Sequence, residues 1–483
     1  MRILFVASEA YPLAKTGGLA DVCGALPIAL NAFGHDARVL MPAYPETLAK
    51  ATEVTELADL GRPLGMSPAR LLKARSPDGG LNLFLLDCPP LFDRAGGPYG
   101  DSTGKDWPDN PLRFGLLGQT AARLVLDDRL ADWRADILHG HDWQAGLAFA
   151  YLHAWNMRRP ATVFTIHNIA YQGMFDVGWV MRLELPWSLF SIEGIEYYGS
   201  LSFLKAGCHY ADRLTTVSPT YAREIQSAPQ GCGLEGLLAK RSADLTGILN
   251  GADYGVWNPA TDPLLSQRFA ASEMKGKAKA RTALEAELGL APDPDQPILC
   301  VVSRLNAHKG MDLVLAALPD RLEKGARFVL LGTGDAEFET GFRRLADRFP
   351  DRAKVTIGYS ETLAHRILAG ADILLMPSRA EPCGLTQMYA YRYGVVPLVG
   401  RVGGLADSVA EPGEGERSGF LVDPVAAESL DAALDRALRL FADRPAWRTL
   451  VKRNARLDFG WERAAHSYDA LYSQLLRQRG RTP

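Results

Sequence analysis

Two short stretches of the chain combine a pair of glycines with charged residues in a way that suits anion binding. The first, Lys15-Thr16-Gly17-Gly18-Leu19-Ala20-Asp21-Val22, follows an apolar run at 3–7 and leads into a predicted helix. Backbone N–H groups and the positive end of a helix would meet there, and Lys15 adds a full charge. The same core recurs as Gly403-Gly404-Leu405-Ala406-Asp407, again after an apolar run. The repetition predicts two similar α/β halves that act on one anionic ligand.

Two further loops in the second half of the chain also suit phosphate. The stretch 303–310 contains Arg304 and Lys309, of which arginine can fork onto two oxygens while lysine acts as a point charge. The stretch 377–386 contains Glu381, and Pro382 suits the first turn of a helix that would start there. The amides expected at that helix end belong to Cys383, Gly384, Leu385 and Thr386. Glu381 is either a helix cap or a group that binds sugar hydroxyls while the amides hold a phosphate.

Polar residues also follow predicted strands in the first half. His139 and His141 alternate on a strand, so both imidazoles share one face and a metal pair is conceivable. The sequence has no third cluster of ligands to accompany them, and no metal site is expected. Asp142 and His167 lie at strand ends, where substrate contacts are the favoured interpretation. Aromatic residues between Tyr171 and Tyr198 indicate either a packed loop or a sugar-stacking surface.

These loops require a parallel sheet in each half to position them. Near-continuous apolar runs, which are typical of strands buried on both faces, alternate with helical patterns. The runs that predict strands are 3–7, 36–42, 81–86, 137–139, 161–166 and 213–217, then 297–303, 326–332, 354–357, 372–377 and 395–399. The segment 43–76 is less regular and is interpreted as an insertion. The fold class expected is α/β, with two doubly wound Rossmann-like domains that face a deep cleft and bind ligands at the carboxyl ends of their strands.

Composition excludes several other classes of protein. The chain has 483 residues, too many for one hydrophobic core, and a net charge of −3, which gives no reason to expect a nucleic-acid or anionic-membrane partner. Its six cysteines are scattered without a C-x-x-C pair, a pattern that fits reduced thiols in a cytosol. The apolar run at the N-terminus is short and is interrupted by Glu9, so it predicts a strand rather than a signal peptide. We therefore expect a cytoplasmic protein.

The motifs together resemble the bacterial glycogen synthases and plant starch synthases over nearly the whole chain. The resemblance is carried by the stretch 15–22, His141-Asp142-Trp143, the stretch 165–173, the stretch 216–222, Ile248-Leu249-Asn250-Gly251 and Glu381-Pro382-Cys383-Gly384-Leu385-Thr386-Gln387. The lysine loop near the N-terminus together with Glu-Pro-Cys-Gly-Leu is specific to this family. Because the loop begins at residue 15, the bacterial glycogen enzymes are favoured over plastid ones.

The resemblance implies a GT-B glycosyltransferase with an acceptor-side domain at 1–250 and a nucleotide-sugar-binding domain at 251–460. The C-terminal helix, 461–483, is expected to pack back on the first domain. The implied reaction transfers glucose from ADP-glucose to the non-reducing 4-OH of an α-1,4-glucan with retention at C1. The implied partners are ADP-glucose or ADP and a glycogen or maltooligosaccharide acceptor, with no metal or other cofactor.

The resemblance also implies roles for individual residues. Lys15, with the Gly17-Gly18 turn, and the pair Arg304 and Lys309 would hold the diphosphate from the two domains. Glu381 and the amides of residues 383–386 would hold glucose and the distal phosphate, while Asp21 and Tyr359 would contact the nucleotide. Asp142, His167 and Asn250 would line the glucose and acceptor side. Catalysis is assigned to Glu381, Lys15, His167 and Asp142.

Two departures and several alternatives remain at this point. His308 stands where the family usually has glutamine, and Val402 where it usually has threonine. Another nucleotide-sugar glucosyltransferase with a different acceptor, a nucleotide-sugar epimerase of the same fold, and a non-catalytic glucan-binding module are the rival functions. The residues themselves do not distinguish ADP-glucose from UDP-glucose, so that choice rests on the resemblance.

Overall fold

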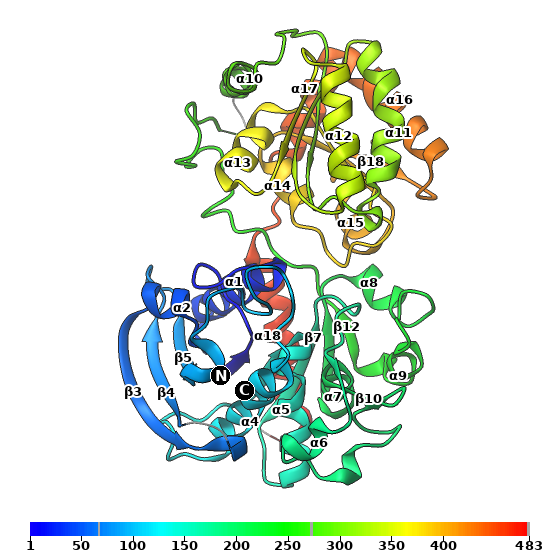
Figure 1. Cartoon of the computed structure of the whole chain (residues 1–483). Helices are drawn as coiled ribbons and strands as arrows, with labels where there is room; N and C mark the ends of the chain where they lie inside the picture. Colours follow the sequence, from blue (N-terminus) through cyan, green and yellow to red (C-terminus); the bar gives the residue numbers. More distant parts are fainter. Residues whose placement is uncertain (66–67, 271–273, 481–483) are drawn as a thin grey trace. The chain divides into compact units, whose positions relative to one another are not determined.

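The computed structural model describes residues 1–65, 68–270 and 274–480, and the chain divides into two compact units (Figure 1). Unit 1 contains Met1–Gly251 together with the C-terminal segment that begins at Trp461. Unit 2 contains Ala252–Gly460. Each unit has its own sheet, its own covering helices and its own buried side chains.

Unit 1 is built on a nine-stranded sheet in the order β12-β11-β7-β6-β1-β2-β5-β4-β3. Its strands are β1 (Arg2–Val6), β2 (Asp36–Pro42), β3 (Thr52–Gly61), β4 (Ala69–Arg75), β5 (Asn82–Asp87), β6 (Ile137–His141), β7 (Ala161–Ile166), β11 (Arg213–Thr216) and β12 (Leu245–Gly247). Neighbours from β12 to β5 pair in parallel, so their carboxyl ends share one edge of the sheet. The central strands are buried on both faces, as their apolar runs predicted.

Helices cover this sheet, and a small hairpin sheet accompanies it. The helices are α1 (Gly18–Ala32), α2 (Pro45–Lys50), α3 (Pro89–Phe92), α4 (Asn110–Leu126), α5 (Asp142–Trp155), α6 (Trp179–Arg182), α7 (Phe203–Tyr210), α8 (Pro219–Glu224), α9 (Glu235–Lys240) and α18 (Trp461–Gln478). Strands β8 (Met174–Phe175), β9 (Glu196–Tyr197) and β10 (Ser200–Ser202) form a separate antiparallel sheet in the order β8-β10-β9. The 3-10 turns are Pro63–Gly65, Trp187–Leu189 and Ser242–Asp244.

The segment 43–76, interpreted from sequence as an irregular insertion, extends the main sheet instead. Strands β3 and β4 pair antiparallel with each other, and β4 pairs antiparallel with β5. Most side chains of β3 are exposed, because β3 is an edge strand with few neighbours to bury it. A strand of this kind lacks the continuous apolar run by which the other strands were recognised.

The last helix, α18, returns to unit 1 and packs with its elements. Tyr472 on this helix places its hydroxyl 2.7 Å from His139 Nδ1 on β6. The Asp469 carboxylate of α18 forms a hydrogen bond with the His35 ring at 2.9 Å. Arg479, just beyond the helix, donates to Asp212 at 2.7 Å. The expected helix range extended to 483, and residues 481–483 lie outside the described residues.

Unit 2 has a six-stranded, wholly parallel sheet in the order β15-β14-β13-β16-β17-β18. Its strands are β13 (Ile298–Val302), β14 (Arg327–Gly332), β15 (Ala353–Ile357), β16 (Ile373–Met376), β17 (Val396–Gly400) and β18 (Phe420–Val422). Its helices are α10 (Met274–Leu288), α11 (Met311–Glu323), α12 (Ala336–Arg348), α13 (Glu361–Gly370), α14 (Thr386–Arg392), α15 (Gly403–Ser408), α16 (Ala427–Ala442) and α17 (Arg444–Asn454), with a 3-10 turn at Ala307–Lys309.

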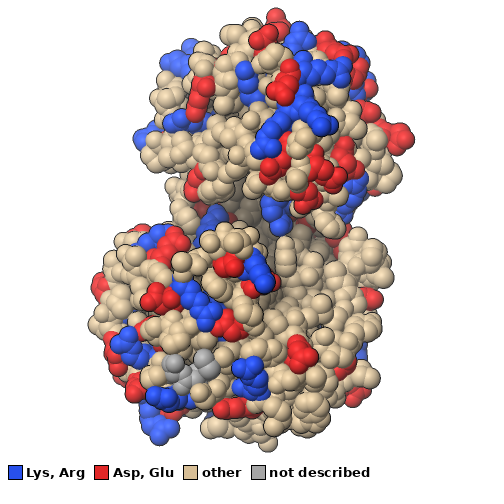
Figure 2. All heavy atoms as spheres, viewed as in Figure 1, with Lys and Arg blue, Asp and Glu red and all other residues tan. Residues whose placement is uncertain are grey.

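The surface and the helices agree with the balanced composition. Figure 2 shows Lys and Arg interspersed with Asp and Glu on the visible face of each unit, as a net charge of −3 implies. In the described ranges 1–65, 68–270 and 274–480, no helix has the length and apolar character needed to cross a membrane. No two of the six cysteines, all of which the structure describes, form a disulfide.

Candidate active site

The predicted residues of unit 1 follow the carboxyl ends of its parallel strands. The Lys15 loop follows β1, Asp142 follows β6, His167 follows β7 and Asn250 follows β12. Because these strands are parallel, the residues gather at one edge of the sheet, where an open α/β sheet binds its ligands.

The glycine pair in the Lys15 loop leaves space at the start of α1. Gly17 caps the helix in an extended conformation, with φ −159° and ψ −165°. A Cβ built on Gly17 or Gly18 would meet no atom within 4 Å. The turn therefore does not require glycine for its backbone angles. What the glycines provide is room for a group to approach the first amides of α1 closely.

Glu9, which the sequence analysis treated only as an interruption of an apolar run, anchors this loop. Its carboxylate accepts hydrogen bonds from the Thr16 backbone N–H, from Thr16 Oγ1 at 2.8 Å and from the Tyr99 hydroxyl at 2.7 Å. Glu9 is buried, and burial raises the pKa of its carboxyl, while the bonds from Tyr99 and Thr16 act in the opposite direction. The local sequence does not distinguish this buried glutamate from an exposed one, because its partners Thr16 and Tyr99 lie elsewhere along the chain.

Lys15 and Asp21, both predicted to contact the nucleotide, contact each other. Lys15 Nζ donates to Asp21 Oδ1 at 2.7 Å and lies 5.3 Å from the centre of the Tyr11 ring. Both side chains are partly exposed. An exposed ion pair of this kind is weak, so its two charges can be redirected to a ligand at small cost.

Asp142 is held in an unusual backbone conformation at the first position of α5. Its φ is +55°, a region that non-glycine residues seldom occupy, and such strain concentrates at functional sites. Its Oδ1 accepts the His167 backbone N–H at 2.7 Å, which ties the end of β6 to the end of β7. Burial raises the pKa of this carboxyl to about 7, although the amides of His167 and Asn168 favour its charged form. The group is therefore poised to change its protonation near neutral pH.

Three of the histidines of unit 1, His139, His141 and His167, form a buried and neutral series. His141 Nδ1 lies 3.0 Å from His167 Nε2, and burial lowers the pKa of His167 to about 3. His139 hydrogen bonds to Tyr472 on one side and at 2.6 Å to Thr165 on the other. His139 therefore has structural partners on both nitrogens. In the described part of the chain, no group of three or more His, Cys, Asp or Glu side chains is arranged to hold a metal ion.

Asn250 and the aromatic segment complete the predicted features of unit 1. Asn250 is buried, and its Oδ1 has no hydrogen-bond partner among the residues that the structure describes. An unpaired buried amide oxygen is costly unless something binds it, which favours a ligand there. In the aromatic segment, Tyr171, Trp187 and Tyr198 are all more than half exposed. These three therefore do not form a core, and the stacking surface remains a hypothesis.

In unit 2, the Arg304 loop follows β13 and the Glu381 loop follows β16, and the two are locked together. Gly310 adopts φ +70°, and a Cβ there would lie 2.2 Å from the Pro377 carbonyl oxygen, so only glycine fits. The Arg379 backbone N–H donates to the His308 carbonyl at 2.8 Å, and the Arg379 side chain donates to the Ala307 carbonyl at 2.6 Å. These contacts join the two loops into one body.

Lys309 and Glu381 form an ion pair within this body. Lys309 Nζ lies 2.5 Å from Glu381 Oε2, and the Ser378 hydroxyl donates to the same oxygen at 3.2 Å. Both charged side chains are largely buried. The contact places a carboxylate and an ammonium at the same sheet edge as Arg304, which is exposed. Sequence predicted both residues for the site but not that they would pair, since they are far apart along the chain.

The helix after Glu381 begins later than sequence indicated. Helix α14 starts at Thr386, so Pro382 lies outside it and Glu381 is not its cap. Gly384 takes φ +71°, and Gln387 donates to the carbonyls of Cys383 and Gly384, which fixes an irregular turn before the helix. Within the described residues, the amides of Gly384 and Leu385 donate no hydrogen bond. These amides are thus available at the end of β16. The prediction that a helix begins directly after Glu381 was wrong.

The second glycine pair does not repeat the role of the first. A Cβ on Gly403 would lie 2.0 Å from the Glu381 carbonyl oxygen, and one on Gly404 would lie 2.2 Å from that of Cys383. The Gly404 amide donates to the Glu381 carbonyl at 3.1 Å. This pair supports the Glu381 loop from beneath, so the interpretation of residues 403–407 as a second anion loop was wrong for the Gly404 amide.

Tyr359 follows β15, at the edge of the unit 2 sheet. Its side chain is 79% exposed, and its hydroxyl donates to Glu361 at 3.3 Å. The position at a strand's carboxyl end is compatible with a nucleotide contact, which stays a prediction.

Known proteins resemble this chain over nearly its full length. The starch synthase catalytic domain family matches residues 2–240, and the glycosyl transferases group 1 family matches residues 287–452. A protein named glycogen synthase from Paramagnetospirillum magneticum is 53% identical, with 98% of each chain covered. Another with that name, from Rhodospirillum rubrum, is 48% identical, with 99% of each chain covered.

Solved structures agree with these sequence relatives. The catalytic domain of starch synthase IV from Arabidopsis thaliana, solved bound to ADP and acarbose, matches with a TM-score of 0.89 and 30% identity over 98% of this chain and 99% of that one. Sucrose-phosphate synthase from Thermosynechococcus elongatus matches with a TM-score of 0.59 and 19% identity, which shows a shared GT-B fold alone. The mainly parallel sheet of unit 1, the parallel sheet of unit 2, the loops at their carboxyl edges and this level of identity together establish that the chain belongs to the bacterial glycogen synthase family of glycosyltransferases.

Proposed function

We propose that the protein transfers glucose from ADP-glucose to the non-reducing 4-OH of an α-1,4-glucan, with retention of configuration at C1. Relatives about half identical over nearly the whole chain bear the name glycogen synthase, and the Arabidopsis neighbour was solved with ADP and acarbose. Glycogen or a maltooligosaccharide is the proposed acceptor, and the cytoplasm is the proposed location. Neither a metal nor another cofactor is part of the proposed reaction.

The observation that carries the proposal is the joined body of two loops at the carboxyl edge of the unit 2 sheet. It presents Arg304, Lys309 and Glu381 together with the amides of Gly384 and Leu385. Arginine and lysine suit the two phosphates of a nucleoside diphosphate sugar, and a carboxylate suits the hydroxyl groups of its glucose. A rigid arrangement of this kind holds a donor without reorganisation during the reaction.

The chemistry proposed for these groups is stabilisation of the leaving ADP. As the bond between glucose C1 and the distal phosphate oxygen breaks, charge grows on the phosphate, and Arg304 and Lys309 offset it. The acceptor 4-OH oxygen forms its bond to C1 on the same face, and its proton passes to the departing phosphate. Lys309 donates one of its three protons to Glu381 at 2.5 Å, so it has protons left to donate to the phosphate while the contact fixes the Glu381 carboxylate.

Unit 1 is proposed to bind the glucose and the acceptor. Asp142 and His167 are buried at the end of β6 and β7, and the His167 amide fixes the Asp142 carboxylate. His167 is neutral because burial lowers its pKa, so it can donate a hydrogen bond to a sugar hydroxyl without adding charge. Lys15 of unit 1 and Arg304 of unit 2 would act on one donor, so the proposal requires both units to reach the same molecule.

The direct test is incorporation of labelled glucose into glycogen, compared between ADP-glucose and UDP-glucose at equal concentration. We expect polymer growth with ADP-glucose that a chelator leaves unchanged. Release of ADP without polymer growth would contradict the synthase reaction, and interconversion of the donor sugar would indicate an epimerase.

Variants at Lys309 and Lys15 test the proposed phosphate contacts. Lys309→Ala and Lys15→Gln should each lower kcat by about 100-fold or more, the usual effect of losing one preorganised contact to developing charge. Lys354→Gln, a charge loss elsewhere in unit 2 on β15, is the matched control and should keep full activity. An unchanged kcat in Lys15→Gln would refute the requirement for both units.

A further inference from the structure

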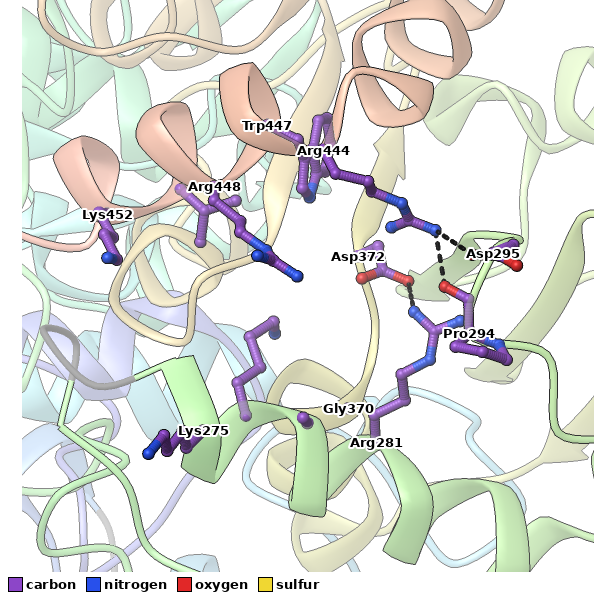
Figure 3. Close-up of a pocket in the computed structure, with 13 residues that line it drawn as sticks. Lys275, Arg281, Pro294, Asp295, Gly370, Asp372, Arg444, Trp447, Arg448 and Lys452 are labelled. Atoms are coloured by element: carbon purple, nitrogen blue, oxygen red, sulfur yellow. Dashed lines mark hydrogen bonds and ion pairs between the residues drawn. The ribbon is translucent and has the colours of Figure 1, made fainter.

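A pocket in unit 2 lies at the opposite edge of the sheet from the proposed donor loops. Its walls include Pro294 and Asp295, which precede β13, and Gly370 and Asp372, which precede β16. Helices α10 and α17 form its two sides (Figure 3). Because the donor loops follow the carboxyl ends of β13 and β16, a pocket at their amino ends is a separate site.

Positive charge dominates the lining of this pocket. It contains six Lys and Arg side chains and two Asp side chains. Asp372 is already engaged, since Arg281 donates to it at 2.6 Å. Asp295 lies 3.9 Å from Arg444, and its side chain is 92% exposed, so it neutralises little charge inside the pocket. The lining therefore has an excess of cations without counter-charges.

Three of these cations have no partner among the residues that the structure describes. Lys275, Arg448 and Lys452 are exposed, and within the described residues none of them forms a hydrogen bond or an ion pair. Arg448 and Lys452 are four residues apart on α17 and lie on the same face of this helix, together with Arg444. Figure 3 shows the Arg448 side chain directed into the space between α17 and α10.

A fourth cation, Lys277, is buried without a carboxylate in contact. Its Nζ donates to the carbonyls of Ala369 at 3.2 Å and Tyr393 at 2.9 Å, which leaves one of its three protons unused. Burial lowers the pKa of this ammonium to about 8. Lys275 and Lys277 also lie in the first turn of α10, where the helix dipole opposes positive side chains. An anion in the pocket would relieve both penalties.

We propose that this pocket binds a small anion that carries a phosphate group and at least two negative charges. Several cations that surround one space favour a group with several oxygens and more than one charge, which a single carboxylate does not supply. The guanidinium of Arg448 matches two phosphate oxygens, and lysines add point charges around it. Inorganic phosphate, pyrophosphate and a sugar phosphate share this chemistry. The proposal goes beyond the transferase reaction and does not depend on it.

The test measures pyrophosphate binding calorimetrically to the full chain saturated with ADP at constant ionic strength. Saturation with ADP occupies the proposed donor site, so the remaining binding reports on a second site. The double variant Arg448→Glu, Lys452→Glu should weaken binding at least about tenfold, since each lost charge-assisted contact is worth about that factor. Lys275→Glu, on the other helix, should weaken it as well. Arg344→Glu, at an exposed arginine of α12, makes the same change in charge as Lys275→Glu, so it is the control for that variant and should bind as the wild type does.

The outcomes separate the proposal from general charge attraction. Equal weakening in Arg344→Glu would show non-specific attraction and would overturn the proposal, as would the absence of binding to the ADP-saturated wild type. Selective loss in the pocket variants supports it. Parallel titrations with inorganic phosphate and with glucose 1-phosphate then identify which phosphate compound the pocket prefers. A preference for glucose 1-phosphate would assign the pocket to a sugar phosphate. The three altered residues have no described protein partner, and a wild-type thermal midpoint would verify that the variants fold.

Discussion

Replacing Asp142 with asparagine should remove a pH-dependent loss of stability from unit 1. Burial raises the pKa of this carboxyl to about 7 in the folded chain, from its ordinary value of 3.8. Between those values the folded chain holds a proton that the unfolded chain has lost. Stability therefore decreases as pH rises through this window, and the decrease is complete above about pH 7.

The size of the effect follows from the difference between the two pKa values. One pKa unit corresponds to about 1.36 kcal/mol, so the window from 3.8 to about 7 gives an upper limit of about 4 kcal/mol. Asparagine keeps an oxygen that can accept the His167 amide, and it tolerates the φ of +55° better than most residues. Asp142→Asn should therefore gain stability relative to the wild type at about pH 8 and lose that advantage near pH 4.

The assay is chemical unfolding of the wild type and of Asp142→Asn at several pH values, with the difference between them plotted against pH. Subtraction cancels titrating groups that do not interact with Asp142, whereas Glu9, whose negative charge raises the pKa of Asp142, contributes to the difference. Asp128→Asn makes the same substitution at an exposed position and is the control. A flat or decreasing difference for Asp142→Asn as pH rises from about 4 to about 8 would refute the reasoning.

Three further predictions concern the supports of the site. Glu9→Gln should lower kcat/KM for the donor by about tenfold or more, because an amide cannot accept all the hydrogen bonds that fix the Lys15 loop. Steady-state kinetics with the donor varied measures this decrease. Gly404→Ala should destabilise unit 2 by about 3 kcal/mol or more by thermal unfolding, whereas Gly17→Ala should leave stability within about 1 kcal/mol and raise KM. Tyr472→Phe leaves His139 with an unpaired buried nitrogen and should lower the free energy of unfolding by about 1–3 kcal/mol. A variant as stable as the wild type would show that this hydrogen bond does not stabilise the packing of α18.

Much of the fold was predictable because parallel strands buried on both faces have a continuous apolar sequence. The runs at 36–42 and 161–166 coincide with β2 and β7. The edge strand β3 was missed, because its exposed side chains need no apolar pattern. The packing of α18 on unit 1 depends on contacts between residues more than 300 positions apart, such as Tyr472 and His139, which no local pattern encodes. Only the family resemblance predicted that this helix packs on unit 1.

The site was predictable where residue type and strand-end position sufficed. Arg304, Lys309 and Glu381 were correctly predicted to follow strand ends. The Lys309–Glu381 contact was not predicted, because it depends on how two loops pack against each other. Glu9 was missed because a buried glutamate within an apolar run has the same sequence signature as a surface one. Its burial is set by Tyr99, which lies 90 positions away along the chain.

The two glycine pairs show why an identical motif does not imply an identical role. At Gly17 and Gly18 the space beside the backbone is open, so a side chain would fit there, and we predict that it would obstruct a ligand at the start of α1. At Gly403 and Gly404 the space is filled by carbonyls of the Glu381 loop, so glycine is required for packing. We therefore expect a side chain at the first pair to affect function with little effect on stability, and one at the second pair to act through the loop that the pair supports. A sequence pattern reports that a side chain is absent, and only the neighbouring atoms determine whether a ligand or the protein itself uses the space.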